Sequence, residues 1–121
     1  MLVDDDPDDR DIFCEVIHEI DKNIQCVVFP GCAKALTYLK KRSSSTPDFI
    51  FLDLNMPATN GMQCITKIKN LEPVRNKPVI IYSTSKNPLD LEAAKKKGVS
   101  FLSKQGHLSV LKADLRKVLR K

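Results

Sequence analysis

The stretch Phe49-Ile50-Phe51-Leu52-Asp53 places a carboxylate directly after four consecutive apolar residues. A short, continuous apolar run is typical of a strand that is covered on both faces, as in the centre of a parallel sheet. A charge so close to a core is costly unless a partner neutralises it. The stretch therefore predicts a buried central strand whose last residue, Asp53, serves chemistry rather than packing.

Short apolar runs and amphipathic stretches alternate on both sides of this strand. Asp6 and Pro7 form a typical helix start, as N-cap and first helical residue. The predicted strands are residues 1–3, 25–29, 49–52, 78–82 and 101–103. The predicted helices are residues 7–20, 33–41, 61–71, 89–97 and from 108 onward, the last with an apolar face of Leu108, Leu111, Leu115, Val118 and Leu119. Five strands alternating with five helices favour a parallel sheet with helices on both faces.

The composition fits one cytoplasmic domain. The chain has 121 residues, of which 42% are apolar and 29% charged, no apolar run of membrane-spanning length and no secretory signal at its start. We expect no membrane partner. The four cysteines have no metal-binding spacing, so we expect reduced core residues rather than disulfides.

The net charge of +5 is distributed unevenly. Residues 1–21 hold nine carboxylates and one basic residue, Arg10, whereas the other 100 residues hold 19 basic and six acidic residues. The basic residues are spread over several segments without interleaved aromatics, as on solvated helix faces. A nucleic-acid partner is therefore the less favoured interpretation.

Side chains able to do chemistry stand at four predicted strand ends, where ligands bind in parallel sheets. They are Asp4 and Asp5, Asp53, Ser83 and Thr84, and Lys104. Neighbouring carboxylates repel one another unless a cation neutralises them, and oxygen ligands suit Mg²⁺, which keeps waters that a phosphate can replace. A lysine adds a compact positive charge and Ser83 a hydroxyl donor. Together these groups predict a phosphoryl-transfer site with Asp53 as nucleophile.

Four segments resemble, in the correct order, the motifs of response-regulator receiver domains of two-component signalling. They are residues 2–7 (LVDDDP), 51–57 (FLDLNMP) with Gly61, 81–84 (IYST) and 101–104 (FLSK). The resemblance covers essentially the whole chain. It implies a doubly wound, flavodoxin-like α/β fold of five parallel strands in the order 2-1-3-4-5 with five helices. Residues 1–121 would be one stand-alone, chemotaxis-regulator-like receiver without an output domain. The opening at residues 4–9 (DDDPDD) and the run at residues 83–85 (STS) resemble a subgroup of small stand-alone receivers, some members of which partner bacterial phytochrome kinases.

The resemblance also implies residue roles. Asp53 would accept a phosphoryl group from a histidine kinase or a histidine phosphotransfer protein. Asp5, Asp53 and the backbone carbonyl of Asn55 would bind Mg²⁺, with Asp4 helping to hold it. Lys104 would pair with Asp53 and afterwards with the phosphoryl group.

Ser83 would then move to bind a phosphoryl oxygen, and Phe101 would turn inward in response. This pair would switch the face formed by the fourth helix, the fifth strand and the fifth helix, where an unknown downstream protein docks. Catalysis would be limited to the domain itself, as phosphoryl acceptance and autodephosphorylation.

Two positions depart from the family pattern. Gln105 stands where the family usually has a proline with a cis peptide; a non-proline cis bond is costly, so we expect a trans or reshaped loop there. Thr84 stands where receivers often have a small residue, which would narrow access to the phosphate and slow its hydrolysis.

Two alternatives follow. If the loop at Gln105 holds Lys104 away from Asp53, the chain is a degenerate receiver that binds proteins without phosphorylation. A Mg²⁺-dependent phosphohydrolase also uses an aspartate nucleophile, but it typically has an acid two residues later, where this chain has Asn55.

Overall fold

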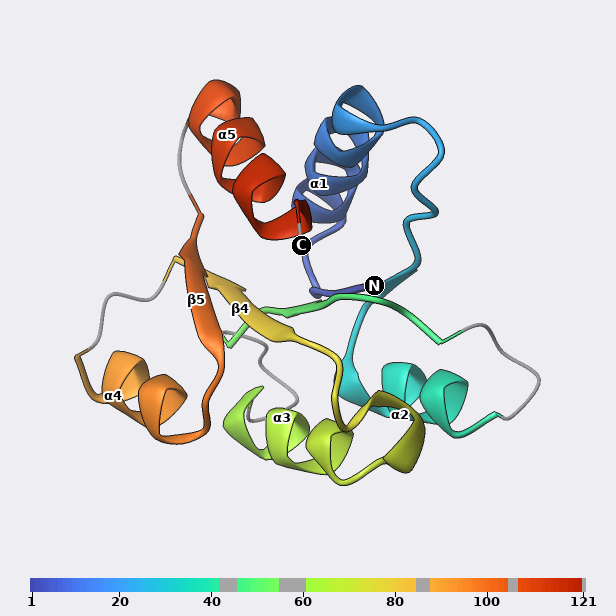
Figure 1. Ribbon diagram of the computed structural model, residues 1–121, viewed down its shortest axis with the longest axis vertical. Helices are drawn as coiled ribbons and strands as arrows, with labels where there is room; N and C mark the ends of the chain where they lie inside the picture. Colours follow the sequence, from blue (N-terminus) through green and yellow to red (C-terminus); the bar gives the residue numbers. More distant parts are fainter. Residues whose placement is uncertain (42–45, 55–60, 85–87, 105–106, 121) are drawn as a thin grey trace.

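A twisted parallel sheet forms the centre of the computed structural model, which describes residues 1–41, 46–54, 61–84, 88–104 and 107–120 (Figure 1). The strands are β1 (Leu2–Val3), β2 (Val28–Phe29), β3 (Ile50–Leu52), β4 (Val79–Ser83) and β5 (Ser100–Ser103). The helices are α1 (Pro7–Ile20), α2 (Cys32–Lys40), α3 (Gly61–Lys69), α4 (Pro88–Lys96) and α5 (Leu108–Leu119), with a 3₁₀ turn at Glu72–Val74. All strand pairs are parallel and the order is β2-β1-β3-β4-β5. The predicted fold class and strand order are confirmed.

The helices form two layers, with α1 and α5 on one face of the sheet and α2, α3 and α4 on the other (Figure 1). Successive residues of a strand face opposite layers. In β3, Ile50 and Leu52 pack in the layer of α2 to α4, whereas Phe51 packs in the layer of α1 and α5. Because both faces are covered, β3 is buried along its whole length, as the apolar run predicts.

Most element ends differ from the sequence prediction by only one or two residues, and the larger differences concern the second strand and the first turn of α5. The second strand covers only Val28–Phe29 instead of residues 25–29, because β1, its one partner, offers just Leu2 and Val3 for pairing. Leu108 is 57% exposed rather than part of the core. The buried face of α5 begins one turn later, at Leu111, so the first turn lies beyond the apolar layer.

The cysteine prediction is wrong for one pair. Cys32 in α2 and Cys64 in α3 form a disulfide, with Cα atoms 6.0 Å apart. Sequence spacing did not reveal this pair because α2 and α3 become neighbours only by packing on the same face of the sheet. Cys14 and Cys26 are half-buried thiols whose Sγ atoms lie 2.6 Å apart.

No helix in the part of the chain that the structure describes is long and apolar enough to cross a membrane.

Candidate functional site

The carboxyl ends of β1, β3, β4 and β5 bring the predicted site residues to one edge of the sheet. Asp4 directly follows β1, Asp53 follows β3, and Lys104 follows β5. The backbone N–H of Asp53 donates to the carbonyl of Val3, and that of Lys104 donates to the carbonyl of Ser83. The parallel ladders therefore continue one residue past the strands and fix the backbone of both side chains.

Three carboxylates meet at this edge. One oxygen from each of Asp4, Asp5 and Asp53 lies within 4.8 Å of the others. Asp4 and Asp53 are buried, whereas Asp5 is exposed. An all-oxygen donor set with one solvent-facing member fits a hard divalent cation such as Mg²⁺, which retains several water ligands. Asn55, whose carbonyl was predicted as a further ligand, lies outside the described residues.

Hydrogen bonds fix Asp4 on several sides. Its Oδ1 accepts the backbone N–H of Asp6 at 3.0 Å, and its backbone carbonyl accepts Nη1 of Arg10 at 2.8 Å. Burial raises the pKa of the Asp4 carboxyl, and the hydrogen bonds from Lys104 and Asp6 only partly oppose this effect. An ionised Asp4 in this position therefore needs positive charge nearby.

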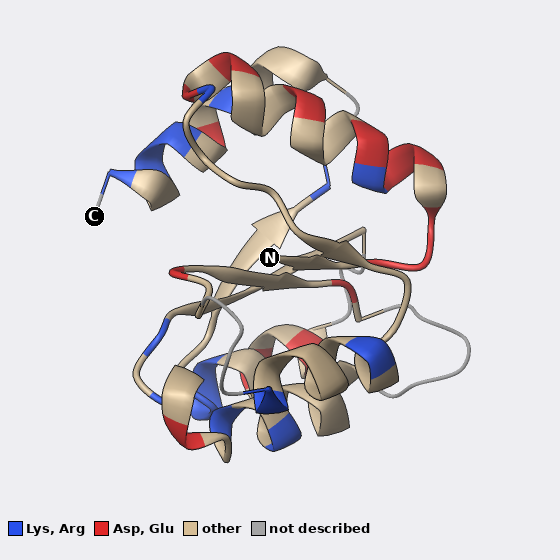
Figure 2. Cartoon of the chain, turned by 90° about the vertical axis from the view of Figure 1, so that its right-hand side faces the viewer, with Lys and Arg blue, Asp and Glu red and all other residues tan. Residues whose placement is uncertain are grey.

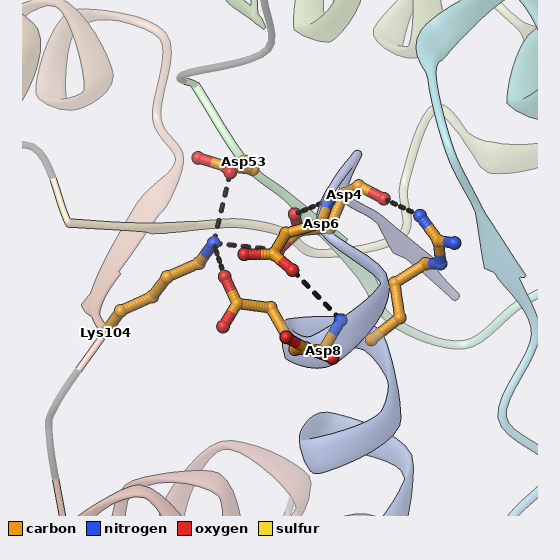
Figure 3. Close-up of polar contacts among 7 residues, drawn as sticks. Asp4, Asp6, Asp8, Asp53 and Lys104 are labelled. Atoms are coloured by element: carbon orange, nitrogen blue, oxygen red, sulfur yellow. Dashed lines mark hydrogen bonds and ion pairs between the residues drawn. The ribbon is translucent and has the colours of Figure 1, made fainter.

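Lys104 supplies that charge, and it contacts three carboxylates at once (Figure 3). Its Nζ lies 2.8 Å from Oδ2 of Asp4, 2.8 Å from Oδ2 of Asp9 and 3.1 Å from Oδ2 of Asp53. Burial alone would lower the pKa of Lys104, but the hydrogen bonds to the three carboxylates outweigh it and raise the pKa. Lys104 makes the contact with Asp53 that the family resemblance implied. Lys104 is therefore not held away from Asp53.

Asp9 was not predicted as a site residue, although the sequence contains a signal for it. Asp9 precedes Phe13 by four residues and Ile17 by eight, so it continues the buried stripe of α1 by one turn. An acidic residue on the core-facing side of a helix indicates a buried or half-buried partner, whereas Asp8 and Asp11 face solvent.

The beginning of α1 follows the predicted design. Asp6 is the N-cap, and its Oδ1 accepts the backbone N–H of Asp8 at 2.9 Å. Asp8 and Asp9 lie in the first turn, where the helix dipole favours negative charge. Figure 2 shows acidic residues gathered along α1 and the segment that leads into it.

Ser83 and Phe101 lie on neighbouring strands, on the same face of the sheet. Ile81 pairs with Phe101, and Ser83 pairs with Ser103. Ile81 and the half-buried Phe101 both pack in the layer of α2 to α4, and Ser83, two residues beyond Ile81, has the same orientation. Ser83 is buried and Thr84 is exposed.

Tyr82 packs in the layer of α1 and α5, and its ring lies beside the ammonium group of Lys104. The Nζ of Lys104 lies 5.3 Å from the centre of its ring. Burial raises the pKa of Tyr82 to about 12, so the phenol stays neutral and its ring offers a π-face to the ammonium group.

A comparison with known families adds to this geometry. The family model described as "Response regulator receiver domain" matches residues 1–116. The chain belongs to this family. Receiver domains are signalling modules of two-component systems rather than enzymes; they bind a divalent metal ion and interact with histidine kinases or phosphotransfer proteins and with downstream targets.

Similar proteins include other receivers. The response regulator Rcp1 of Synechocystis is 27% identical over 116 residues, which cover 92% of this chain and 79% of Rcp1. The positive alginate biosynthesis regulatory protein of Pseudomonas aeruginosa is 27% identical over 121 residues, but the match covers only 45% of that protein.

Solved structures of receivers are similar as well. The phosphorylated cyanobacterial phytochrome response regulator RcpA superposes with a TM-score of 0.85 at 27% identity, covering 97% of this chain and 87% of RcpA. The Mn²⁺-bound form of Rcp1 gives a TM-score of 0.76 at 25% identity, with coverages of 97% and 88%.

Proposed function

We propose that this receiver accepts a phosphoryl group on Asp53, with Mg²⁺ bound beside it, from a histidine kinase or a histidine phosphotransfer protein. The observation that supports this most strongly is the convergence of Asp4, Asp5 and Asp53 with the ammonium group of Lys104 at one sheet edge. A buried carboxylate with a lysine 3.1 Å away and metal-binding oxygens beside it can act as a phosphoryl acceptor.

In the proposed step, an oxygen of the Asp53 carboxylate attacks the phosphorus of the donor. A new O–P bond forms, the bond from phosphorus to the donor breaks, and the leaving group keeps the electron pair. Lys104 stabilises the negative charge on the transferring group, and Asp4, Asp5 and Asp53 would hold the metal. When bound, Mg²⁺ supplies charge neutralisation for the phosphoryl oxygens. Water later attacks the same phosphorus, the O–P bond to Asp53 breaks, and phosphate leaves with the Asp53 carboxylate regenerated. Thr84, which directly follows β4, would narrow access to the phosphoryl group and slow this hydrolysis.

Signalling would follow from the residues next to the site. Ser83 would donate its hydroxyl to a phosphoryl oxygen, and Phe101, on the same sheet face, would move inward as Ser83 shifts. Both residues lie on the β4–β5 pair, which leads into α4 and α5.

The α4–β5–α5 face is the proposed docking surface for a downstream protein. The starts of α4 and α5 follow two neighbouring strands, and both carry exposed apolar side chains. These are Leu89, Leu91, Leu108 and Val110, with Leu89 72% exposed. Exposed apolar side chains near a switching site are suited to a protein partner. We propose a cytoplasmic location for this chain.

Intact-mass measurement after incubation with acetyl phosphate tests the proposal. We expect the wild-type chain to gain one phosphoryl group only when Mg²⁺ is present, and Asp53→Asn to gain none. A folded, Mg²⁺-binding wild-type chain that gains nothing would contradict the proposal and favour a scaffold that works without phosphorylation.

A further inference from the structure

Among the described carboxylates that contact Lys104, Asp9 is the one that belongs to a helix rather than to a strand end. Leu102 of β5 packs in the layer of α1 and α5, and Lys104 follows two residues later along the same backbone ladder. Its side chain therefore leaves the sheet on the side of α1. There Asp9, in the first turn of α1, receives the ammonium group at 2.8 Å.

Asp9 also differs from Asp4 and Asp53 in what else it can bind. Asp4 and Asp53 belong with Asp5 to the described carboxylate cluster that fits a metal, and Asp9 does not. A cation bound to that cluster would compete with Lys104 for the negative charge of Asp4 and Asp53, and a phosphoryl group would replace the Asp53 oxygen as a partner of Lys104. Of the three contacts, the one with Asp9 involves neither a candidate metal ligand nor the proposed phosphoryl acceptor.

We propose that Asp9 is a positioning residue for phosphoryl transfer, which holds the ammonium group of Lys104 at the acceptor edge from the side of α1. The inference rests on the proposed function and adds a residue to it. An ammonium group has three donors, and here each one has a carboxylate acceptor. Asp9 occupies one donor and leaves the donor on Asp53 directed at the acceptor. Its side chain is 32% exposed, so its charge stays hydrated without needing the metal.

Asp8 provides a matched control. It lies next to Asp9 in the first turn of α1, has the same charge and the same favourable interaction with the helix dipole, and is exposed. Asp8→Asn therefore reproduces the loss of charge without the loss of the Lys104 contact. Asp9→Glu keeps the carboxylate and serves as the conservative variant.

Two measurements test the inference on wild type, D9N, D9E and D8N, each checked for folding by circular dichroism. The first is the rate at which an amine-acylating reagent modifies Lys104, read by peptide mass spectrometry. We expect a several-fold increase in D9N, because the ammonium loses an anchor, and none in D8N. The second is phosphorylation by acetyl phosphate at saturating Mg²⁺. We expect D9N to lower the maximal rate about tenfold, less than the loss of a direct transition-state donor would, with the half-saturating donor concentration unchanged.

The outcomes separate this inference from the proposed function. Recovery of the rate in D9E supports positioning by the carboxylate. A D9N rate equal to that of D8N, or above wild type as expected if Asp9 competes with the phosphoryl group, overturns the inference. If wild type gains no phosphoryl group, the proposed function fails; unchanged acylation of Lys104 in D9N would separately overturn the anchoring by Asp9.

Discussion

Replacing Lys104 with methionine removes the one described cation that contacts Asp4, Asp9 and Asp53 together. The Lys104 side chain is only 11% exposed, and the side chains of Asp4 and Asp53 are more deeply buried. Removing one partner of a buried ion pair leaves uncompensated charge and costs about 3–5 kcal/mol, whereas the more exposed contact with Asp9 adds at most about 1 kcal/mol. We therefore expect Lys104→Met to lower the free energy of unfolding by about 3–5 kcal/mol.

Urea denaturation measures this change. With a slope of about 2 kcal/mol per molar urea for a domain of this size, the midpoint should fall by roughly 2 M. Saturating Mg²⁺ should recover part of the loss, because it would bind the same carboxylates.

The matched control is Lys112→Met, which breaks the exposed ion pair of Lys112 with Glu19, where the nitrogen and oxygen are 3.7 Å apart and the side chains are 31% and 57% exposed. We expect less than about 1 kcal/mol there. Equal effects of the two substitutions, or equal rescue of both variants by Mg²⁺, would refute the electrostatic reasoning.

Three further predictions concern the surroundings of the site. In Gly61→Ala, the new Cβ would lie 2.8 Å from the Cα of Leu54 and 3.2 Å from the carbonyl oxygen of Asp53, so urea denaturation should show a free energy of unfolding lower by about 1–3 kcal/mol. The control is Gly31→Ala, whose Cβ meets no atom within 4 Å and which should change stability little. Equal losses in the two variants would exclude the steric explanation. Under denaturing conditions without reductant, an alkylating reagent should modify Cys14 and Cys26 only, and all four cysteines after reduction; modification of all four before reduction would exclude the disulfide. Burial raises the pKa of Asp4, so the metal-free protein loses stability as the pH rises from about 3.9, the ordinary aspartate value, through the raised pKa. The Mg²⁺-induced increase in Tm should therefore grow as the pH rises above about 3.9. An increase independent of pH would show that Asp4 does not interact with the metal.

Much of the fold follows from patterns that are local in the sequence. The buried run at residues 49–52, the N-cap Asp6 and the apolar stripe of α1 each specify an element without knowledge of the rest of the chain. The site could be predicted because parallel strands place their carboxyl ends at one edge, so residues that follow different strands meet there. The proximity of Asp4, Asp53 and Lys104 could be predicted in this way.

Features that depend on packing between elements were not found. The disulfide of Cys32 and Cys64 requires two helices to share one sheet face, and no spacing rule gives that distance. The contact between Asp9 and Lys104 joins α1 to the residue that follows β5, so it depends on how α1 packs on the sheet. Asp9 was also hard to distinguish from the other acidic residues of α1, although it alone continues the buried stripe of that helix. Leu108 fits the helical periodicity, but the core ends before the first turn of α5.

The most direct test of the central claim is to locate the phosphoryl group. The chain would be incubated with acetyl phosphate and Mg²⁺, treated with borohydride, which reduces an acyl phosphate to an alcohol and leaves carboxylates unchanged, and mapped by peptide mass spectrometry. We predict reduction at Asp53 alone. Reduction at Asp4, at Asp5 or at no residue of the folded, Mg²⁺-binding protein would contradict the assignment of Asp53 as the phosphoryl acceptor.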